Sequence, residues 1–289
     1  MIDSKTETMN DKQLLALTSL FEDDFSIDWL VELTGCKASQ VITVLDEGVT
    51  SEYLVHRGSG IYYFSDGVKQ KELSDSIGKK EIISFHDRIA DLLMRELPEN
   101  DQKAQIIAYH LLHTKNTIEQ CHYLIQAGDS SQRSFKTQHA FQCYAKALED
   151  LTDKKGKDVD RVFTQTAIKY SKYSTARHDT SKVVETLEDA LKRANKIKDR
   201  STQALLEMHI AKNEWLQGNH GNAMTRFDAG WKIANEVQDP KLQRSATTFG
   251  TFFLYWQGRF KEAVKSYETY VTDVERYPKG GFPILATIT

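Results

Sequence analysis

Cysteine, proline and glycine are scarce in this 289-residue chain, which has 3, 4 and 15 of them. Three cysteines (Cys36, Cys121 and Cys143) are an odd number and form no CxxC pair. This excludes a disulfide framework or a cysteine-rich zinc module and favours a reducing compartment. Few helix-breaking residues, together with a hydrophobic content of 40%, predict a folded and mostly helical protein.

Long apolar runs are also missing. Runs such as residues 14–17 and 106–112 are interrupted within a few residues and are far shorter than the roughly 20 residues that a membrane-spanning helix needs. The first ten residues are polar and lack the basic and apolar regions of a secretory signal. We therefore expect a disordered N-terminus at residues 1–10 and a cytoplasmic protein with no membrane partner.

Residues 11–80 are predicted to form a winged-helix-like domain. Amphipathic helices are expected at residues 11–22, 27–33 and 38–47, with Ser26 as the N-cap of the second helix and a tight turn at residues 34–37. Two β-rich segments, residues 53–56 and 61–64, are joined by the sequence RGSG, which is typical of a hairpin turn. Three helices followed by a hairpin indicate a winged helix; an unrelated small helical subdomain is the alternative.

Residues 81–289 contain an internal repeat with a period of 40 residues, as Ala194 aligns with Ala234 and Gly218 with Gly258. Small residues let neighbouring helices approach closely, and the glycine marks the turn between paired helices. We therefore predict an α-solenoid of tetratricopeptide-like helical hairpins. We expect the last repeat to be cut short at residues 282–289, as in an excerpt from a longer protein. The other aligned positions are Val183, Ala223 and Ala263, then Leu187, Phe227 and Tyr267, then Trp215 and Tyr255, with a fainter copy at Ala140, Tyr144 and Ala147.

Several short motifs occur in the order found in one family. Residues 64–73 (FSDGVKQKEL) resemble the segment after the winged helix in signal-transduction ATPases of the STAND class. Residues 85–90 (FHDRIA) resemble the family's L-H-x-x-I-A helix. Residues 107–110 (IAYH) and 123–128 (YLIQAG) resemble the L-A-Y-H and Y-L-x-x-A-G lines that open its helical repeats. The resemblance extends over residues 12–280.

The resemblance implies a regulatory fragment whose winged helix packs on an ATPase domain and whose repeats sense a ligand or partner. That ATPase domain would lie upstream in the full-length protein or act in trans. The sequence has no GxxxxGK[ST] motif, so we expect no nucleotide hydrolysis and no cofactor for this polypeptide. Asp66 replaces the family's sensor histidine, and its carboxylate would repel a phosphate.

The charge distribution bears on a DNA-binding role for the winged helix. The net charge of the chain is only -3, but residues 1–65 hold 11 acidic and 4 basic residues. Between residues 26 and 65 only Lys37 and Arg57 could contact phosphates, so we expect protein packing here and no nucleic-acid partner. A stand-alone winged-helix transcriptional regulator with a helical sensor domain remains the alternative.

No residue pattern predicts catalysis or a metal site. His110 and His113 are three residues apart, with His86 and His122 elsewhere, but nothing in the sequence fixes a set of convergent zinc ligands. There is no nucleophile elbow and no paired-carboxylate motif. The three cysteines lie in apolar contexts that favour buried thiols, so we predict a protein that is not an enzyme.

A partner-binding groove is the remaining candidate site. In tetratricopeptide-like arrays the first helix of each hairpin lines a concave groove. Large and basic side chains of these helices could hold a protein or peptide partner there, although most such aromatic residues pack between repeats. We therefore predict a non-catalytic regulatory or sensor fragment of a signalling ATPase or transcriptional regulator that mediates protein or ligand interactions. The candidate groove residues are Lys172, Lys212, Trp215, Phe252, Tyr255 and Trp256.

Overall fold

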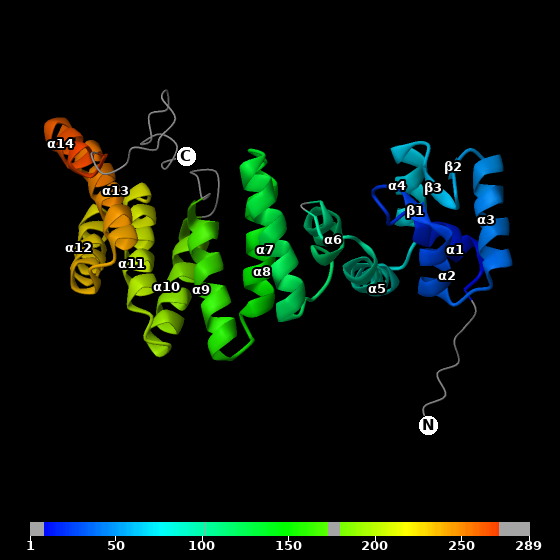
Figure 1. The fold of residues 1–289 in the computed structure, drawn as a ribbon, viewed down its shortest axis with the longest axis horizontal. Coiled ribbons are helices and arrows are strands. Elements are labelled where there is room, and N and C mark those ends of the chain that lie inside the picture. Colours follow the sequence, from blue (N-terminus) through cyan, green and yellow to red (C-terminus); the bar gives the residue numbers. More distant parts are fainter. Residues whose placement is uncertain (1–8, 101, 173–179, 272–289) are drawn as a thin grey trace. The chain divides into compact units, whose positions relative to one another are not determined.

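The structure, a computed structural model, describes residues 9–100, 102–172 and 180–271. The predictions for residues 1–8 and for the truncated end of the last repeat lie outside the described residues. The chain divides into two compact units, Met1–Asn116 and Thr117–Thr289, and both are mostly helical (Figure 1). None of the described helices combines the length and apolar character that crossing a bilayer requires.

The N-terminal unit combines helices with a small antiparallel sheet of strand order β1-β3-β2. The predicted three helices and hairpin are present, whereas the two-residue strand β1, which pairs Phe25 with Tyr62, was missed. The winged-helix assignment itself stays a prediction. The elements are α1 (Asp11–Thr18), β1 (Phe25–Ser26), α2 (Ile27–Thr34), α3 (Ala38–Thr50), β2 (Leu54–Gly58), β3 (Ile61–Phe64), α4 (Gly67–Asp75), α5 (Lys79–Glu96) and α6 (Lys103–Leu111).

Local sequence sets the ends of the early helices. Asn10 forms a capping box with Gln13 at the start of α1. The Ser26 hydroxyl accepts the backbone N–H of Trp29 at 3.2 Å, which confirms Ser26 as the N-cap of α2. Gly35 ends α2 with a φ of 68°, a left-handed conformation that glycine adopts without steric cost. The tight turn predicted at residues 34–37 follows from this geometry.

Helices α5 and α6 belong to the N-terminal unit, so the division between the units lies well beyond the boundary predicted at residue 80. Arg95 of α5 forms an ion pair with Glu32 of α2 at 2.6 Å. The ring of Phe21 contacts that of His110 in α6 edge-on, with centroids 6.1 Å apart. These contacts join segments far apart in sequence, which is why the local pattern of residues 81–116 did not reveal their partner.

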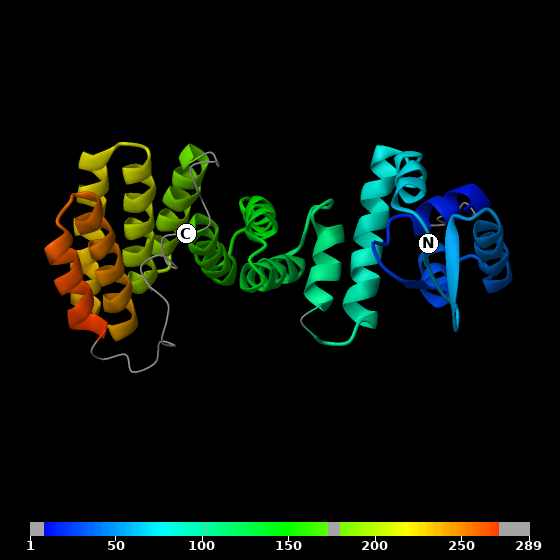
Figure 2. The same cartoon turned by 90° about the horizontal axis from the view of Figure 1, so that it is seen from above.

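The described residues of the C-terminal unit form a series of four helical hairpins, each made of two consecutive helices that pack side by side (Figures 1 and 2). The described part of this unit therefore has the tetratricopeptide-like architecture that the 40-residue period predicted. The hairpins are α7 (Ile118–Arg133) with α8 (Thr137–Leu151), α9 (Lys157–Lys172) with α10 (Thr180–Lys196), α11 (Arg200–Leu216) with α12 (His220–Val237), and α13 (Pro240–Trp256) with α14 (Phe260–Val271).

The aligned glycines form the turns inside the last two hairpins. Gly218 and Gly258 have φ angles of 85° and 74°. Their backbone N–H groups donate to the carbonyl oxygens of Trp215 and Tyr255, both at 3.0 Å. A residue with a side chain is strained in this conformation, so the glycine repeats because the turn repeats.

Small aligned residues allow the helices to pack closely. Val183, Ala223 and Ala263 are all buried, as the repeat predicted. The side chain of Tyr267 lies outside the described residues. Gly230 brings α12 so close to α11 that an added Cβ would lie 2.8 Å from the carbonyl oxygen of Ala204. The packing of successive helices therefore requires the smallest residue at this position.

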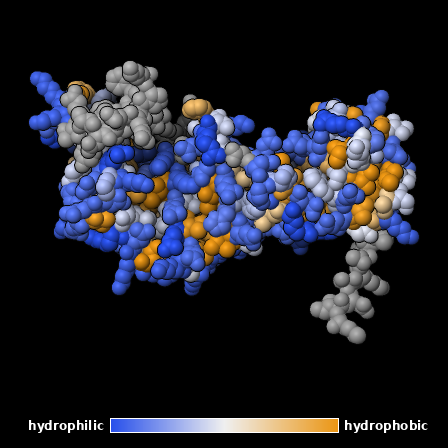
Figure 3. All heavy atoms as spheres, in the orientation of Figure 1, coloured by the Kyte–Doolittle hydropathy of each residue, from blue (hydrophilic) through white to orange (hydrophobic). Residues whose placement is uncertain are grey.

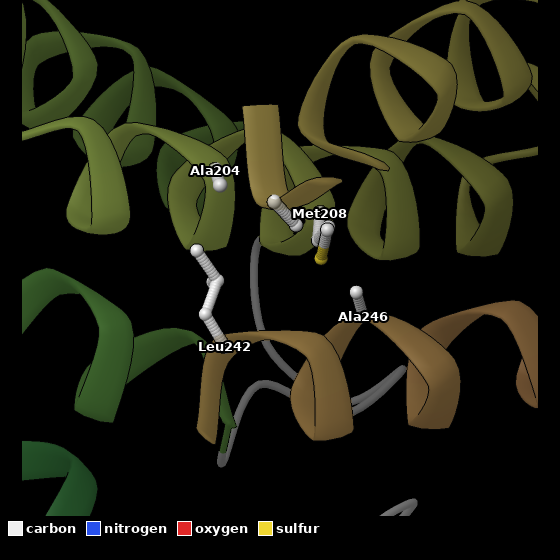
Figure 4. Close-up of a cluster of buried hydrophobic side chains, with 5 residues drawn as sticks. Ala204, Met208, Leu242 and Ala246 are labelled. Carbon is white, nitrogen blue, oxygen red and sulfur yellow. The ribbon is translucent and has the colours of Figure 1, made fainter. Parts of the chain in front are cut away.

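A buried apolar cluster joins α11 to α13 (Figure 4). Leu242 and Ala246 of α13 face Ala204 and Met208 of α11, and Ala234 of α12 completes the cluster. Burial of a side chain such as Leu242, which is 3% exposed, contributes about 1.5–3 kcal/mol to folding. These contacts hold one hairpin against the next.

The first helices of the last three hairpins contact one another directly. Helix α11 contacts both α9 and α13. Contacts of that extent are absent among α8, α10 and α12 within the described ranges. We call the surface formed by α7, α9, α11 and α13 the inner face.

Candidate functional site

Two rows of side chains cross the inner face at intervals of 40 residues. The second row contains Lys172, Lys212 and Phe252, which the sequence had singled out, and begins at Gln132. The first row was missed, although applying the same period to charged residues would have found it. Its members are Asp129, Lys169, His209 and Phe249.

The acidic end of the first row is fully paired. The Lys169 ammonium donates to both carboxylate oxygens of Asp129, at 2.8 and 2.6 Å. The Tyr144 hydroxyl donates to Oδ1 of the same carboxylate at 2.7 Å. Asp129 therefore links α7 to both α8 and α9, and its charge is already neutralised by Lys169.

His209 occupies the middle of the first row and joins three first helices. Its Nδ1 lies 2.9 Å from the hydroxyl oxygen of Ser171 on α9, and its ring meets that of Phe249 on α13 edge-on at 4.9 Å. Burial, reinforced by the nearby charges of Lys212 and Lys172, holds the pKa of His209 well below its usual value. The imidazole is therefore neutral at neutral pH and acts as a hydrogen-bonding spacer.

The lysines of the second row are close enough to repel each other. Lys212 is only 9% exposed, and its ammonium lies 3.4 Å from the carbonyl oxygen of Ser171. Burial, and then the charge of Lys172, lowers the pKa of Lys212 to about 8. Partial burial and the charge of Lys169 also lower the pKa of Lys172, while Asp129 opposes this shift. Within the described part of the chain, neither Lys172 nor Lys212 forms an ion pair.

The aromatic candidates divide into packed and exposed residues. Trp215 lies against His220 and Phe253, with ring centroids 4.2 and 5.4 Å away, and Phe252 is 5% exposed in a cluster that includes Phe253. Trp215 and Phe252 therefore contribute mainly to the core between hairpins. Their positions in the repeat made them groove candidates, but residues that pack between hairpins recur at the same 40-residue spacing.

Tyr255 and Trp256 remain accessible at the end of α13. They are 49% and 53% exposed, and their rings meet edge-on at 5.8 Å. The Trp256 ring also contacts Phe252 of the second row at 6.2 Å. Figure 3 shows that apolar side chains reach the surface of the repeat unit in separate patches among hydrophilic ones. The inner face thus changes from charged at α7 and α9 to aromatic at α13.

Asn213, next to Lys212, contains an unusual buried amide. Its Nδ2 donates to the carbonyl oxygen of His209 at 2.8 Å, while its Oδ1 has no hydrogen-bond partner among the described residues. A buried acceptor without a donor costs about 1–3 kcal/mol. A second buried group without a partner among the described residues, Gln217 Nε2, lies at the C-cap of the same helix.

The N-terminal unit offers little for phosphate binding. The solvent-facing side of α3, the helix that would enter a DNA groove, carries no lysine or arginine. Arg57 on the hairpin is held by Asp24 at 2.5 Å and lies over the Tyr63 ring at 4.6 Å. The exposed residues of α3 are Ala38, Ser39, Ile42, Thr43, Asp46, Glu47 and Thr50.

Three histidines that are apart in sequence meet in this unit. His86 Nδ1 lies 2.9 Å from His110 Nδ1, and the His86 and His113 rings stack at 4.5 Å. Burial lowers the pKa of all three, that of His86 to about 4. No group of three potential metal ligands with suitable geometry occurs among the described residues.

Asp66 caps a helix, and the cysteines are buried. The Asp66 carboxylate accepts the backbone N–H of Val68 at 2.8 Å and caps α4. All three cysteines are buried, as predicted. Burial raises the pKa of both Cys121 and Cys143 to about 12, which suppresses the nucleophilic thiolate.

Comparisons with known proteins found distantly similar solved structures but no family. No family model matches the chain, and no curated protein matches it. Among solved structures, the chain is similar to a STAND protein with a tetratricopeptide repeat sensor from Pyrococcus horikoshii, with a TM-score of 0.42 and 12% identity over 92% of this chain and 51% of that one. It is also similar to a Rap protein complexed with Competence and Sporulation Factor, with a TM-score of 0.44 and 13% identity over 84% of this chain and 64% of that one. A third is aspartyl phosphate phosphatase F from Bacillus subtilis, with a TM-score of 0.42 and 11% identity over 94% of this chain and 75% of that one.

Proposed function

We propose that the repeat unit is a protein-interaction module whose inner face binds an extended segment of a partner protein. The proposal rests on the charged and aromatic side chains that the inner face leaves accessible. Helical packing is completed by small residues such as Ala223 and Gly230, yet charged and aromatic side chains remain incompletely paired along the first helices. Lys172 and Trp256 can contact a partner without disturbing the packing between hairpins.

We infer a regulatory and non-catalytic role for the chain as a whole. Burial raises the pKa of the Cys121 and Cys143 thiols to about 12, and His86 and His110 are buried with lowered pKa values. In this role the N-terminal unit is a winged helix that packs on another protein domain, such as a signalling ATPase domain upstream or in trans. The repeat unit would then communicate partner binding to that domain.

DNA binding is the alternative for the N-terminal unit, and its charges argue against it. A groove-binding helix needs cations along its exposed side, while α3 presents Asp46 and Glu47 there. We expect no electrophoretic shift of duplex DNA, even at low salt. A shift that weakens steeply as salt increases would reinstate the DNA-binding regulator.

The experiment for the proposed function uses selection followed by matched variants. A library of random peptides is selected on the immobilised full chain, and individual peptides are then measured in solution. Trp256→Ala should weaken their binding, because Trp256 is exposed at the aromatic end of the inner face. Trp231→Ala is the matched control, because Trp231 is 36% exposed on α12, a second helix of a hairpin.

Melting curves of both variants establish that each remains folded. If no peptide is selected, or if the selected peptides bind Trp256→Ala as tightly as the unmodified chain, the inner face is not the binding surface. If Trp231→Ala alone weakens binding, the partner occupies the second helices instead.

A further inference from the structure

Two lysines on the inner face occupy equivalent positions in successive hairpins. Lys172 lies at the end of α9, and Lys212 lies 40 residues later on α11. The ammonium of Lys212 contacts the carbonyl oxygen of Ser171, the residue that precedes Lys172. The backbone contact therefore places the Lys212 ammonium at the end of α9, where Lys172 also lies.

Among the described residues, no acidic side chain forms an ion pair with Lys172 or Lys212, and Asp129 offsets the charge of Lys172 only in part. Asp129 is the acidic group that influences Lys172, and its carboxylate is already bound by Lys169 and Tyr144. His209, which also contacts Ser171, is neutral because burial lowers its pKa, so it does not offset the charge of the lysines. The surroundings of the two lysines therefore have an excess of positive charge.

Burial makes this excess unusual. Lys212 is 9% exposed, and a buried ammonium is ordinarily paired with a carboxylate. Among the described residues Lys212 makes one hydrogen bond, to a backbone carbonyl, whereas an ammonium can donate three. A ligand anion would accept hydrogen bonds from this ammonium and reduce the repulsion from Lys172.

We propose that Lys172 and Lys212 together bind a carboxylate of the partner segment that occupies the inner face. This inference rests on the proposed function and adds the chemistry of the ligand. The carboxylate belongs either to the C-terminus of the segment or to an aspartate or glutamate side chain.

The aromatic end of the inner face indicates which side chains of the partner segment would lie next to the bound carboxylate. Phe252 follows Lys212 in the second row, and Trp256 contacts Phe252 with ring centroids 6.2 Å apart. A segment that extends from the lysines toward α13 would place apolar side chains against Trp256 and Tyr255, which are both about half exposed. The preferred ligand is therefore an acidic peptide with an apolar or aromatic residue near its acidic group.

The test compares two lysine pairs that have the same spacing. The site variant is Lys172→Gln with Lys212→Gln. The control is Lys192→Gln with Lys232→Gln, because these exposed lysines are also 40 residues apart but lie on the second helices α10 and α12. Both are made in the full chain, and their melting curves are recorded.

The probes are fluorescein-labelled decapeptides from the selection described above. Each is made with a free C-terminal carboxylate, with a C-terminal amide, and with aspartate and glutamate replaced by asparagine and glutamine. Fluorescence anisotropy gives the dissociation constant of each peptide with each variant at low and high salt. The amide and the side-chain replacements separate the two possible sources of the carboxylate.

We expect the site variant to bind about tenfold more weakly or worse, as befits the loss of a charge-assisted contact, and the control pair to change affinity by less than about twofold. Removing the bound carboxylate from the peptide should weaken binding to the unmodified chain by a similar factor. The same removal should cost the site variant little, because both changes delete one interaction. Affinity for the unmodified chain should fall as salt increases.

Several outcomes would overturn the inference. Equal binding by the site variant, or tight binding of peptides without any carboxylate, shows that the lysines are not an anion site. If Trp256→Ala weakens binding while the lysine variant does not, the inner-face function stands and the carboxylate site fails. Should the double variant unfold, Lys212→Met alone replaces it, since methionine fills a similar volume without a buried charge.

Discussion

Acidification should weaken the N-terminal unit through its histidine cluster, and His86 alone accounts for about 2 kcal/mol between about pH 7.5 and about pH 5. His86 Nδ1 lies 2.9 Å from His110 Nδ1, so one imidazole must donate and the other accept. Protonation of both rings removes the acceptor and places like charges in contact. Burial, and then His113, lowers the pKa of His86 to about 4.

The direction of the effect follows from proton binding. The unfolded histidine titrates near about pH 6.5, so between that pH and about pH 4 the unfolded chain binds more protons than the folded one. The contribution of His86 to stability is therefore complete above about pH 6.5 and is lost as the pH falls. His110 and His113, whose pKa values are also lowered by burial, act in the same direction.

Hydrogen exchange measured by mass spectrometry reports this loss in the full chain. Protection of the α5 and α6 amides, corrected for intrinsic exchange rates, should fall about thirtyfold from about pH 7.5 to about pH 5. The double variant His86→Leu, His110→Leu removes both partners and should lose much less protection over the same interval. Ile89→Val, a buried residue of the same helix, should reduce protection equally at both pH values.

Two results would refute the reasoning. One is protection in the unmodified chain that changes by less than about threefold, which corresponds to under 1 kcal/mol. The other is a His86 imidazole that titrates near about pH 6.5 when followed by nuclear magnetic resonance, because the folded environment would then not disfavour the charged ring.

Three further predictions concern packing and thiol chemistry. Gly230→Ala should lower the free energy of unfolding, measured in urea, by more than about 1 kcal/mol, because the new Cβ would lie 2.8 Å from a backbone oxygen. Gly221→Ala on the same helix has open space around it and should be neutral or stabilising. Equal effects of the two substitutions would contradict the close approach of α12 to α11. Leu242→Ala should cost about 2–5 kcal/mol by the same assay, and a loss below about 1 kcal/mol would mean that the cluster in Figure 4 does not join the hairpins. Cys121 and Cys143 should react with iodoacetamide at least about a hundredfold more slowly in the native chain than in urea, because burial raises the pKa of each thiol to about 12. Mass spectrometry measures the alkylation, and rapid alkylation of the native chain would show that these thiols are accessible.

Features with local causes were predictable from the sequence. Ser26 caps α2 through the backbone N–H of a residue three positions later, and Gly218 and Gly258 form turns whose hydrogen bonds span a few residues. The 40-residue period correctly placed buried small residues such as Val183 and Ala223. Each of these depends on nearest neighbours or on a repeated unit that packs in a repeated way.

The candidate site was predicted only in part, since its properties depend on contacts between helices. The repeat located Lys172 and Lys212 but could not show that Asp129 is taken by Lys169, or that Lys212 is buried. Position also could not distinguish Phe252, which lies in the core, from Trp256, which is half exposed on the same helix. Both kinds of residue recur at helical spacing, so only packing separates them.

The sequence by itself determined the helical class, the repeat register and the turns of this protein, because backbone preference and side-chain size act over short distances. Only the tertiary structure decided that α5 and α6 join the N-terminal unit, that His86 meets His110, and that two lysines share one end of α9. Charge pairing and burial depend on which distant segments meet. For that reason the same lysines that are ordinary in sequence become a candidate anion site in the folded chain.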